Sequence, residues 1–153
     1  MLASLSIVLL VVVIGLGAFA LLGWWSQAGG YGAPGLQPDG RLASCAPAPN
    51  CVCSEAGGDE EHAVVPLAAG AVDWTEVADA VRAVGGGGII VEGDYLHATF
   101  TSRIFRFTDD LELRRDGEYL QVRSASRVGH SDLGANRKRV EALRRLLTAS
   151  TRR

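Results

Sequence analysis

The segment between Arg123 and Arg139 gathers the side chains of this chain that are best suited to chemistry. It places arginines, serines, an acid and an amide at the predicted junction between a strand and a helix. Backbone donors and charged side chains converge at such junctions, which therefore often hold ligands. In a strand, Arg123 and Arg127 share one face and form a fork suited to carboxylate or phosphate. Ser124 and Ser126 share the other face.

Two neighbouring acids, Asp109 and Asp110, precede this segment on the previous predicted strand. Neighbours on a strand point to opposite faces, which makes the pair a poor joint metal site. We expect Asp110 to face Arg123 and to pair with it. Asp109 would then lie inward, opposite Ser124, where it needs hydrogen-bond donors. A structural and a catalytic role for Asp109 both stay open.

The start of the last predicted helix adds the remaining candidates. Ser131 or Asp132 can cap this helix, whose N-terminus carries partial positive charge. Asn136 and Arg137 stand in its first turns. The candidate ligand-binding residues are therefore Asp109, Asp110, Arg123, Ser124, Ser126, Arg127, Asp132, Asn136 and Arg137. No catalytic residue is assigned.

A hairpin must position these residues. Asp116-Gly117 predicts a two-residue turn, because both turn positions favour positive φ. The resulting register pairs Leu113 with Leu120 and Leu111 with Val122, so that both apolar pairs fall on one face. The polar pairs fall on the opposite face. A slip by one residue would mix the two sets, so the agreement between turn and pattern supports this register.

Other elements flank the hairpin. A helix is predicted over 72–84, with Asp73 and Glu76 spaced as a capping box, and four glycines at 85–88 end it. Strands are predicted over 89–92, 95–101 and 104–107, the last with Phe105 and Phe107 inward, and a final helix over 133–149. This order predicts an α+β two-layer sandwich in which two helices cover an antiparallel sheet of about four strands.

The N-terminal region differs in composition. Residues 2–23 carry no charged side chain, and Trp24-Trp25 follow where an aromatic belt would lie. We expect residues 1–25 to be one transmembrane helix that anchors the protein. A cleaved signal peptide is the alternative, but the basic n-region is missing. The Gly- and Pro-rich segment 26–43 predicts a flexible linker, and 44–153 one soluble domain.

The charge pattern and the motifs limit the function. The net charge is −2, yet fourteen acids and five arginines lie within 54–118, whereas nine basic residues and two acids lie within 119–153. These halves attract each other, or the basic half meets an anionic lipid or another anion. Because the basic residues lack interleaved aromatics, we expect no nucleic-acid partner. No phosphate-loop, dinucleotide or paired-histidine motif occurs, and we expect no cofactor and no metal.

Three stretches together resemble a known family: Cys45 to Cys51, Phe105 to Asp110, and Arg123 to Arg139. The family is the bacterial and plastid one called domain of unknown function 1499, which has no settled activity. The positions that match its densest part are Phe107, Asp109, Asp110, Arg123, Ser124, Ser126, Arg127, Gly129, Asp132, Gly134, Asn136 and Arg137. The resemblance implies a fold family and does not imply a reaction.

The resemblance also covers Cys45 and Cys51, which we interpret as a disulfide. Cys53, where the family usually has Ser, would be spare or a local exchange partner of Cys51. A metal site and a reduced cytosolic loop are the alternatives, although three cysteines without a nearby fourth ligand match no common zinc spacing. A disulfide requires an oxidising compartment, so we place the domain on the outer, periplasmic face. The positive-inside rule gives almost no information on the orientation of the helix, because the first basic residue of the chain is Arg41.

These observations favour a non-enzymatic domain tethered at the cell envelope. It would bind an anionic ligand, a lipid headgroup or a protein partner of unknown identity through the Arg/Asp/Ser cluster. One alternative is a hydrolase that uses Asp109 or Asp132 with the arginines as an anion clamp. The other is a structural domain whose polar residues form an internal salt-bridge network.

Overall fold

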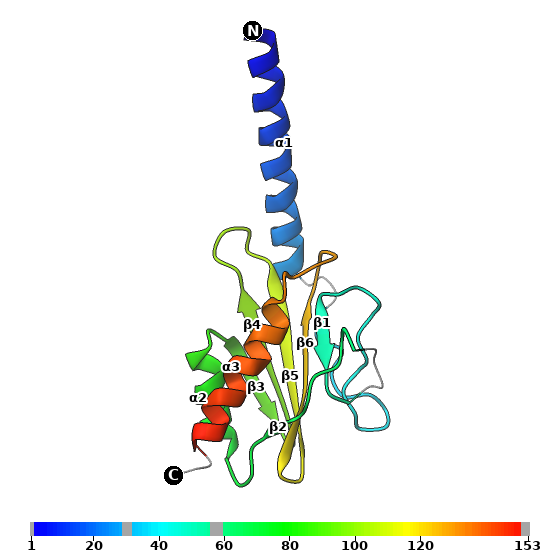
Figure 1. Ribbon diagram of the computed structural model, residues 1–153, viewed down its shortest axis with the longest axis vertical. Helices are drawn as coiled ribbons and strands as arrows, with labels where there is room; N and C mark the ends of the chain where they lie inside the picture. The colour runs from blue at the N-terminus through cyan, green and yellow to red at the C-terminus, as the bar shows by residue number, and fades with distance from the viewer. Residues whose placement is uncertain (1, 29–31, 56–59, 151–153) are drawn as a thin grey trace.

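The computed structural model describes residues 2–28, 32–55 and 60–150. One long helix projects from one end of a domain in which strands and two shorter helices pack together (Figure 1). The helices are α1 (Leu2–Gln27), α2 (Trp74–Ala83) and α3 (Ala135–Ser150). The strands are β1 (Cys51–Cys53), β2 (Leu67–Ala68), β3 (Gly87–Glu92), β4 (Tyr95–Thr101), β5 (Thr108–Asp116) and β6 (Tyr119–Ser126).

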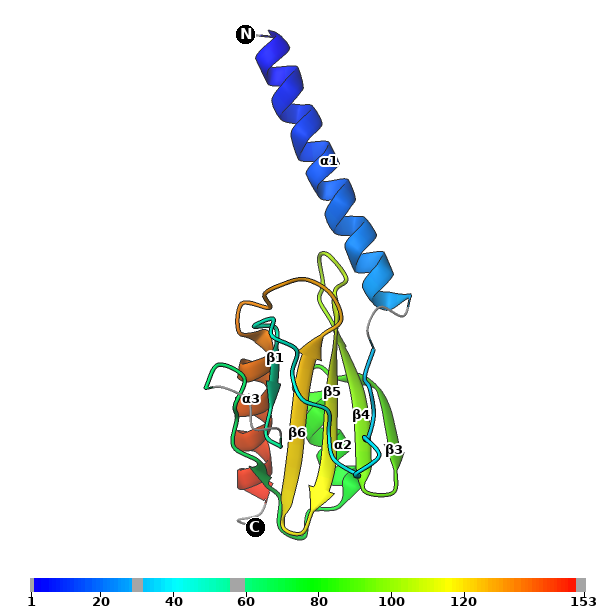
Figure 2. The same ribbon diagram turned by 90° about the vertical axis from the view of Figure 1, so that its right-hand side faces the viewer.

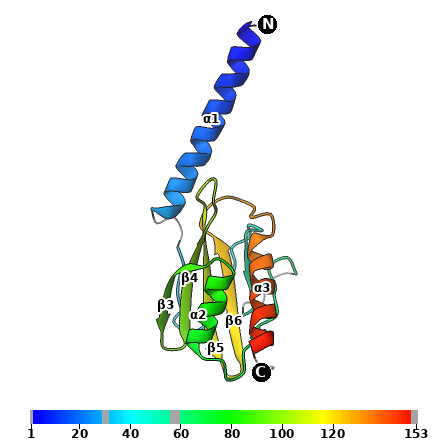
Figure 3. The ribbon, with the colours of Figure 1, turned by 90° about the vertical axis from the view of Figure 1, so that its left-hand side faces the viewer.

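The strands form one six-stranded antiparallel sheet in the order β1-β6-β5-β4-β3, with β2 also paired to β6. Helices α2 and α3 lie side by side on one face of this sheet (Figure 3), which we call the helix face. The predicted α+β class and the two covering helices are confirmed. The sheet exceeds the predicted four strands because β1 and β2, of three and two residues, are too short to show an alternating pattern.

The core lies between the helix face and the two helices. Leu111 and Leu113 on β5 are fully buried, as are Leu120 and Val122 on β6. These four side chains share one face, as the alternation predicted. The helices cover them with the buried residues Val77, Val81, Val140, Leu143 and Leu147.

The predicted hairpin register was wrong by two residues. Leu113 pairs with Val122 rather than Leu120, and Asp116 pairs with Tyr119. The turn residues are thus Gly117 and Glu118, with Gly117 at φ 59°. A type II′ turn requires glycine at its first turn position. The observed register therefore places Gly117 where a positive φ is needed, as the predicted register also did. A shift of two leaves every side chain on its predicted face and changes only its partner.

The segment 104–107 was predicted as a strand and is instead part of the loop between β4 and β5. Phe105 and Phe107 do not face the core. Their rings lie 4.9 Å and 6.4 Å from the ring of Phe19 on α1. The apolar residues at alternate positions of this segment contact the N-terminal helix. The spacing of residues within the domain does not indicate such a contact.

The predicted caps of α2 are present. The Asp73 side chain accepts a hydrogen bond from the Glu76 backbone, and the Glu76 side chain accepts one from the Asp73 backbone. Gly85 then takes a φ of 96° and ends the helix, as expected of the glycine run.

Helix α1 includes one segment, Ser4–Gln27, long and apolar enough to cross a membrane. The chain that follows runs across the sheet on the side opposite α2 and α3, which we call the far face (Figure 2). Leu42 is buried there, and the Gly35 N–H donates to Glu112 over 2.9 Å. The described part of segment 26–43 therefore contacts the sheet.

Candidate functional site

Strand alternation divides the candidate residues between the two faces of the sheet. Asp110, Arg123 and Arg127 lie on the far face, where they form what we call the far-face cluster together with Tyr95, His97 and Glu112. Asp109, Ser124, Ser126 and Asn136 lie on the helix face with Arg139, and we call them the helix-face cluster. The residues predicted to form a single site are therefore divided into two clusters.

Asp110 is the centre of one half of the far-face cluster. It is buried and faces Ala125 across the hairpin, not Arg123 as predicted. Arg127 donates to both of its oxygens at 2.8 Å, and His97 Nε2 lies 2.7 Å from Oδ1. Burial alone would raise the pKa of Asp110, but the hydrogen bonds from Arg127 and His97 outweigh it and hold the pKa below its usual value.

Glu112 is the centre of the other half. This buried carboxylate faces Arg123, which donates to it over 2.8 Å. Tyr95 Oη and the Gly35 backbone N–H donate to its other oxygen, each at 2.9 Å. Burial and the neighbouring Glu112 charge raise the pKa of Tyr95, which keeps its hydroxyl a donor. The two-residue register shift explains this pairing, because it moves Glu112 into the place predicted for Asp110.

Arg123 retains an unused donor. Its Nε is buried and has no hydrogen-bond partner among the described residues. The side chain lines a cavity of about 300 Å³ together with Asp110, Arg127 and Ser126. Four of the nine candidate residues thus share one cavity, whose wall also includes Trp25 at the end of α1.

The helix-face cluster joins β5, β6 and α3. The Ser124 hydroxyl donates to Asn136 Oδ1 over 2.6 Å, and the Asn136 amide donates to Ser126 Oγ over 3.2 Å. Arg139 binds Ser124 and Asn136, and its Nη2 donates to Asp109 over 2.7 Å. Asp109 faces Ser126 across the hairpin, not Ser124 as predicted.

Arg139 was not among the predicted site residues, although its position carried a signal. It follows Asn136 by three residues and so lies on the same side of α3. Its guanidinium also lies 4.1 Å from the centre of the Phe100 ring, a cation–π contact. His97 and Glu112 were missed as well; both stand on the polar side of strands whose alternation was evident.

Asp132 and Arg137 have separate local partners. The Asp132 carboxylate accepts the backbone N–H groups of Gly134 and Asn136 at 2.9 Å and 2.7 Å, and so serves the first turn of α3 as predicted. Arg137 donates to the carbonyls of Glu61 and Ala63 at 2.6 Å and 2.9 Å. Neither side chain joins the far-face cluster.

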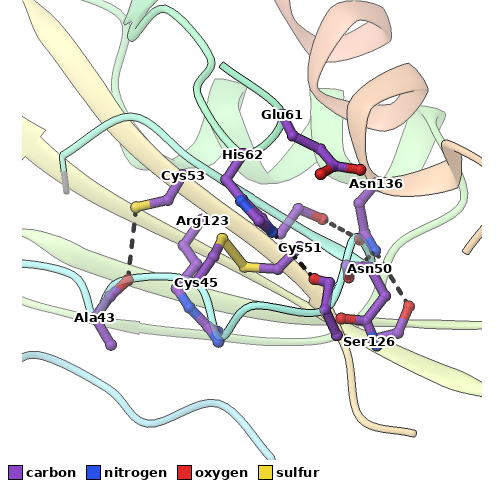
Figure 4. The surroundings of a disulfide bond; sticks show 12 residues. Ala43, Cys45, Asn50, Cys51, Cys53, Glu61, His62, Arg123, Ser126 and Asn136 are labelled. Atoms are coloured by element: carbon purple, nitrogen blue, oxygen red, sulfur yellow. Dashed lines mark hydrogen bonds between the residues drawn. A yellow bond between two sulfur atoms is a disulfide. The ribbon is translucent and has the colours of Figure 1, made fainter. Parts of the chain in front are cut away.

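The disulfide predicted between Cys45 and Cys51 is present (Figure 4). It closes a loop that includes Asn50, whose carbonyl accepts the Ser126 N–H at 2.9 Å and the Asn136 amide at 3.0 Å. The loop is thereby attached to the junction between β6 and α3. Cys53 is a buried free cysteine whose thiol lies 3.5 Å from the Ala43 carbonyl.

A second and larger cavity, of about 720 Å³, lies at the end of the domain next to α1. Six side chains that carry an acid–base or nucleophilic group line it: Ser102, Asp109, Ser126, His130, Ser131 and Asp132. Within the described ranges, no group of three or more His, Cys, Asp or Glu side chains is placed to hold a metal ion.

Comparison with known proteins gives one result. Neither the curated proteins nor the solved structures contain a significant match to this chain. A family model described as "Protein of unknown function (DUF1499)" matches residues 41–147, which is more than two thirds of the chain and includes both clusters. The chain therefore belongs to the DUF1499 family of proteins of unknown function.

Proposed function

We propose that this protein is a membrane-tethered domain of the cell envelope that binds an anionic oxygen group, a phosphate or a carboxylate, in the cavity next to Arg123. The observation that carries the proposal is the buried Nε of Arg123, which has no partner within the described structure. A buried donor without a partner costs about 1–3 kcal/mol, and a small rotation of the Arg123 side chain toward an anionic oxygen in the cavity would remove this cost.

The surroundings of this donor support an anion. Arg127 lines the same cavity, and a guanidinium pair suits the planar geometry of a carboxylate or phosphate. Asp110 and Glu112 balance the two arginine charges. Recognition would therefore rest on the directed N–H groups and the exclusion of water, and not on a net positive charge.

The location of the cavity supports a lipid headgroup as the source of the anion. Trp25, the last residue of the predicted anchor, contributes to its wall. A tryptophan at the end of a transmembrane helix lies at the headgroup level. The disulfide supports an oxidising compartment, so we propose the outer face of the membrane for the domain.

Native mass spectrometry of the full-length protein released in detergent tests the proposal. Inorganic phosphate, acetate and a short-chain phosphatidic acid are added separately. We expect an adduct with the wild type that is lost in Arg123→Gln. The matched control, Arg145→Gln, removes an exposed arginine of α3 and keeps the adduct. Binding of phosphate alone indicates a free anion, and binding of the lipid alone indicates a headgroup. No adduct with any probe, or an equal adduct in Arg123→Gln, refutes the proposal.

A hydrolase is the second candidate, favoured by one observation. Asp109, Ser126, His130 and Asp132 line the same large cavity. However, Asp109 is engaged by Arg139 and Asp132 by two backbone N–H groups. Turnover of ester substrates that is abolished by Asp109→Asn, with binding retained, would establish this function instead.

The structural role predicted as the third alternative fits the rest of the polar residues. Arg127 binds Asp110 through two nitrogens and donates its third to the Ser26 carbonyl at the end of α1, at 3.3 Å. Arg137 uses two nitrogens on carbonyls of the loop before β2. We infer that these contacts of Arg127 and Arg137 hold segments together, whereas Arg123 keeps a buried donor without a partner among the described residues.

A further inference from the structure

We propose that the large cavity next to α1 holds one acyl chain of a lipid from the bilayer that α1 crosses. The cavity measures about 720 Å³, which is within the range of about 300–1,000 Å³ typical of small-molecule sites. It lies on the helix-face side of segment 126–129, whose other side lines the anion cavity. The proposal therefore concerns a second site and an apolar ligand.

Three apolar walls from distant parts of the chain line this cavity, which is open on one side. Helix α1 contributes Phe19 and Leu22. The loop between β4 and β5 contributes Ile104, Phe105 and Phe107, and the junction between β6 and α3 contributes Val128 and Leu133. Both segments rise on the α1 side of the domain (Figure 1). An apolar chain would contact all three walls at once.

Helix α1 is fixed against the cavity by close contacts. At Gly23 an added Cβ would lie 1.7 Å from the Phe105 carbonyl oxygen, so only glycine permits this approach. The buried Ser26 hydroxyl accepts the Thr108 N–H at 2.8 Å. Because one wall belongs to the apolar span itself, the cavity is positioned at the edge of the bilayer rather than in the surrounding water.

Two large apolar side chains at the rim of the cavity are almost fully exposed. Ile104 is 82% exposed and Leu133 is 87% exposed. Leu133 also adopts a φ of 53°, a conformation that favours glycine and that here turns a large apolar side chain outward. Removal of such side chains from water is favourable, because the hydrophobic effect scales with the apolar area covered. Hydrocarbon is the occupant that covers both side chains and is continuous with the surroundings of α1.

Charged residues at the rim fit a phospholipid. Arg103 lines the cavity, and Arg106 in the same loop donates to Gln27 at the end of α1 over 3.2 Å. Arginines at a membrane boundary extend their charge to the headgroups while their stems stay in apolar surroundings. A chain in the cavity would leave its headgroup within reach of these cations.

The test uses full-length protein in vesicles of phosphatidylethanolamine and phosphatidylglycerol that contain a phosphatidylcholine with a diazirine in one acyl chain. After illumination, mass spectrometry maps the labelled peptides. We expect adducts on 102–107 and 128–135 in addition to α1. Ala135→Trp fills the cavity from the first residue of α3 and should abolish the adducts on both loops. The matched control, Ala149→Trp, lies exposed at the far end of the same helix and should keep them.

Two outcomes would overturn the proposal. Adducts confined to α1 would show that no chain enters the cavity. Loop adducts of undiminished yield in Ala135→Trp would show that the loops only touch the bilayer surface. Phosphate binding at Arg123 is measured on the same Ala135→Trp variant. Its persistence there, with the loop adducts lost, separates this site from the anion cavity.

Discussion

Two carboxylates on the far face, Asp110 and Glu112, are buried and each is bound to an arginine. Desolvation of a buried ion pair offsets most of its attraction, so the pairs need not add net stability. The removal of one partner is different, because it leaves a buried charge without compensation and costs about 3–5 kcal/mol. These residues therefore constrain the fold even where they do not bind a ligand.

The lowered pKa of Asp110 predicts acid-dependent stability. A carboxyl whose pKa lies below its ordinary 3.8 in the folded state stabilises the fold above that pH, and this contribution is lost as the pH falls through the folded pKa. Asp110→Asn should lower the free energy of unfolding near neutral pH by about 3 kcal/mol, and it should weaken the loss on acidification below about pH 4. Chemical denaturation at a series of pH values measures both effects.

The matched control for this prediction is Asp79→Asn. Asp79 forms an exposed ion pair with Arg82 on α2, and such pairs contribute about 0–1 kcal/mol. Its unfolding curve should follow the wild type at every pH. If Asp110→Asn loses as much stability in acid as the wild type does, the Arg127 and His97 hydrogen bonds are not what lowers this pKa.

Residue types alone identified Asp110, Arg123 and Arg127 as a polar group but not the pairs they form. The face of each residue follows from the period of two, which a register error of two leaves intact. The partner depends on which two residues make the turn. Asp116-Gly117 and Gly117-Glu118 both place a glycine in a tight hairpin turn, so the sequence could not decide between them.

At the scale of the elements, the connection between α2 and β3 depends on a glycine without space for a side chain. A Cβ added at Gly86 would lie 2.5 Å from Val81 Cγ1 and 2.9 Å from Phe100 Cζ. Both neighbours are buried in the core, so neither can move freely. The tight contact holds the end of α2 on the sheet.

Gly86→Ala should therefore lower the free energy of unfolding by about 1–3 kcal/mol, the usual cost of overpacking a core. Gly87→Ala is a control one residue away, because a Cβ there would meet nothing within 4 Å. Thermal unfolding followed by circular dichroism compares the two variants. Equal melting temperatures would mean that the contact with Val81 and Phe100 relaxes at no cost.

Elements with strong local signals were predictable from the sequence. The capping box of α2 and the alternation of β4 and β5 are encoded within a few residues each. The 104–107 loop shows why others were not. Its apolar residues contact α1, more than 80 residues earlier in the chain, so their spacing reflects a distant partner and resembles a strand by coincidence.

At the scale of the whole molecule, the contact of α1 with the domain determines whether both proposed sites exist. Phe19 and Leu22 form a wall of the acyl-chain cavity, and Trp25 a wall of the anion cavity. Gly23 lies between them and permits the close approach to the Phe105 carbonyl. Separation of α1 from the domain would open both cavities.

Gly23→Ala should separate α1 from the 102–107 loop without unfolding the domain. Alanine favours a helix over glycine by about 1 kcal/mol, so any loosening comes from the clash with Phe105 and not from α1 itself. Trypsin should cleave faster after Arg103 and Arg106 in detergent-released Gly23→Ala. Gly17→Ala, where a Cβ meets nothing within 4 Å, should match the wild type. Cleavage at the wild-type rate in Gly23→Ala would show that the contact is dispensable.

The outer-face placement proposed for the domain is a prediction at the scale of the whole molecule. Cys45 and Cys51 are bonded and Cys53 is buried, so no described cysteine is both free and exposed. Labelling of a single added cysteine therefore shows on which side of the membrane that position lies. We expect Ala149→Cys, at an exposed position of α3, to react with a membrane-impermeant maleimide on intact bacterial spheroplasts. A cytosolic protein with an exposed cysteine must stay unlabelled until the membrane is permeabilised. If Ala149→Cys behaves like that cytosolic protein, the domain faces the reducing interior. The Cys45–Cys51 bond would then lack the oxidising compartment that such bonds require.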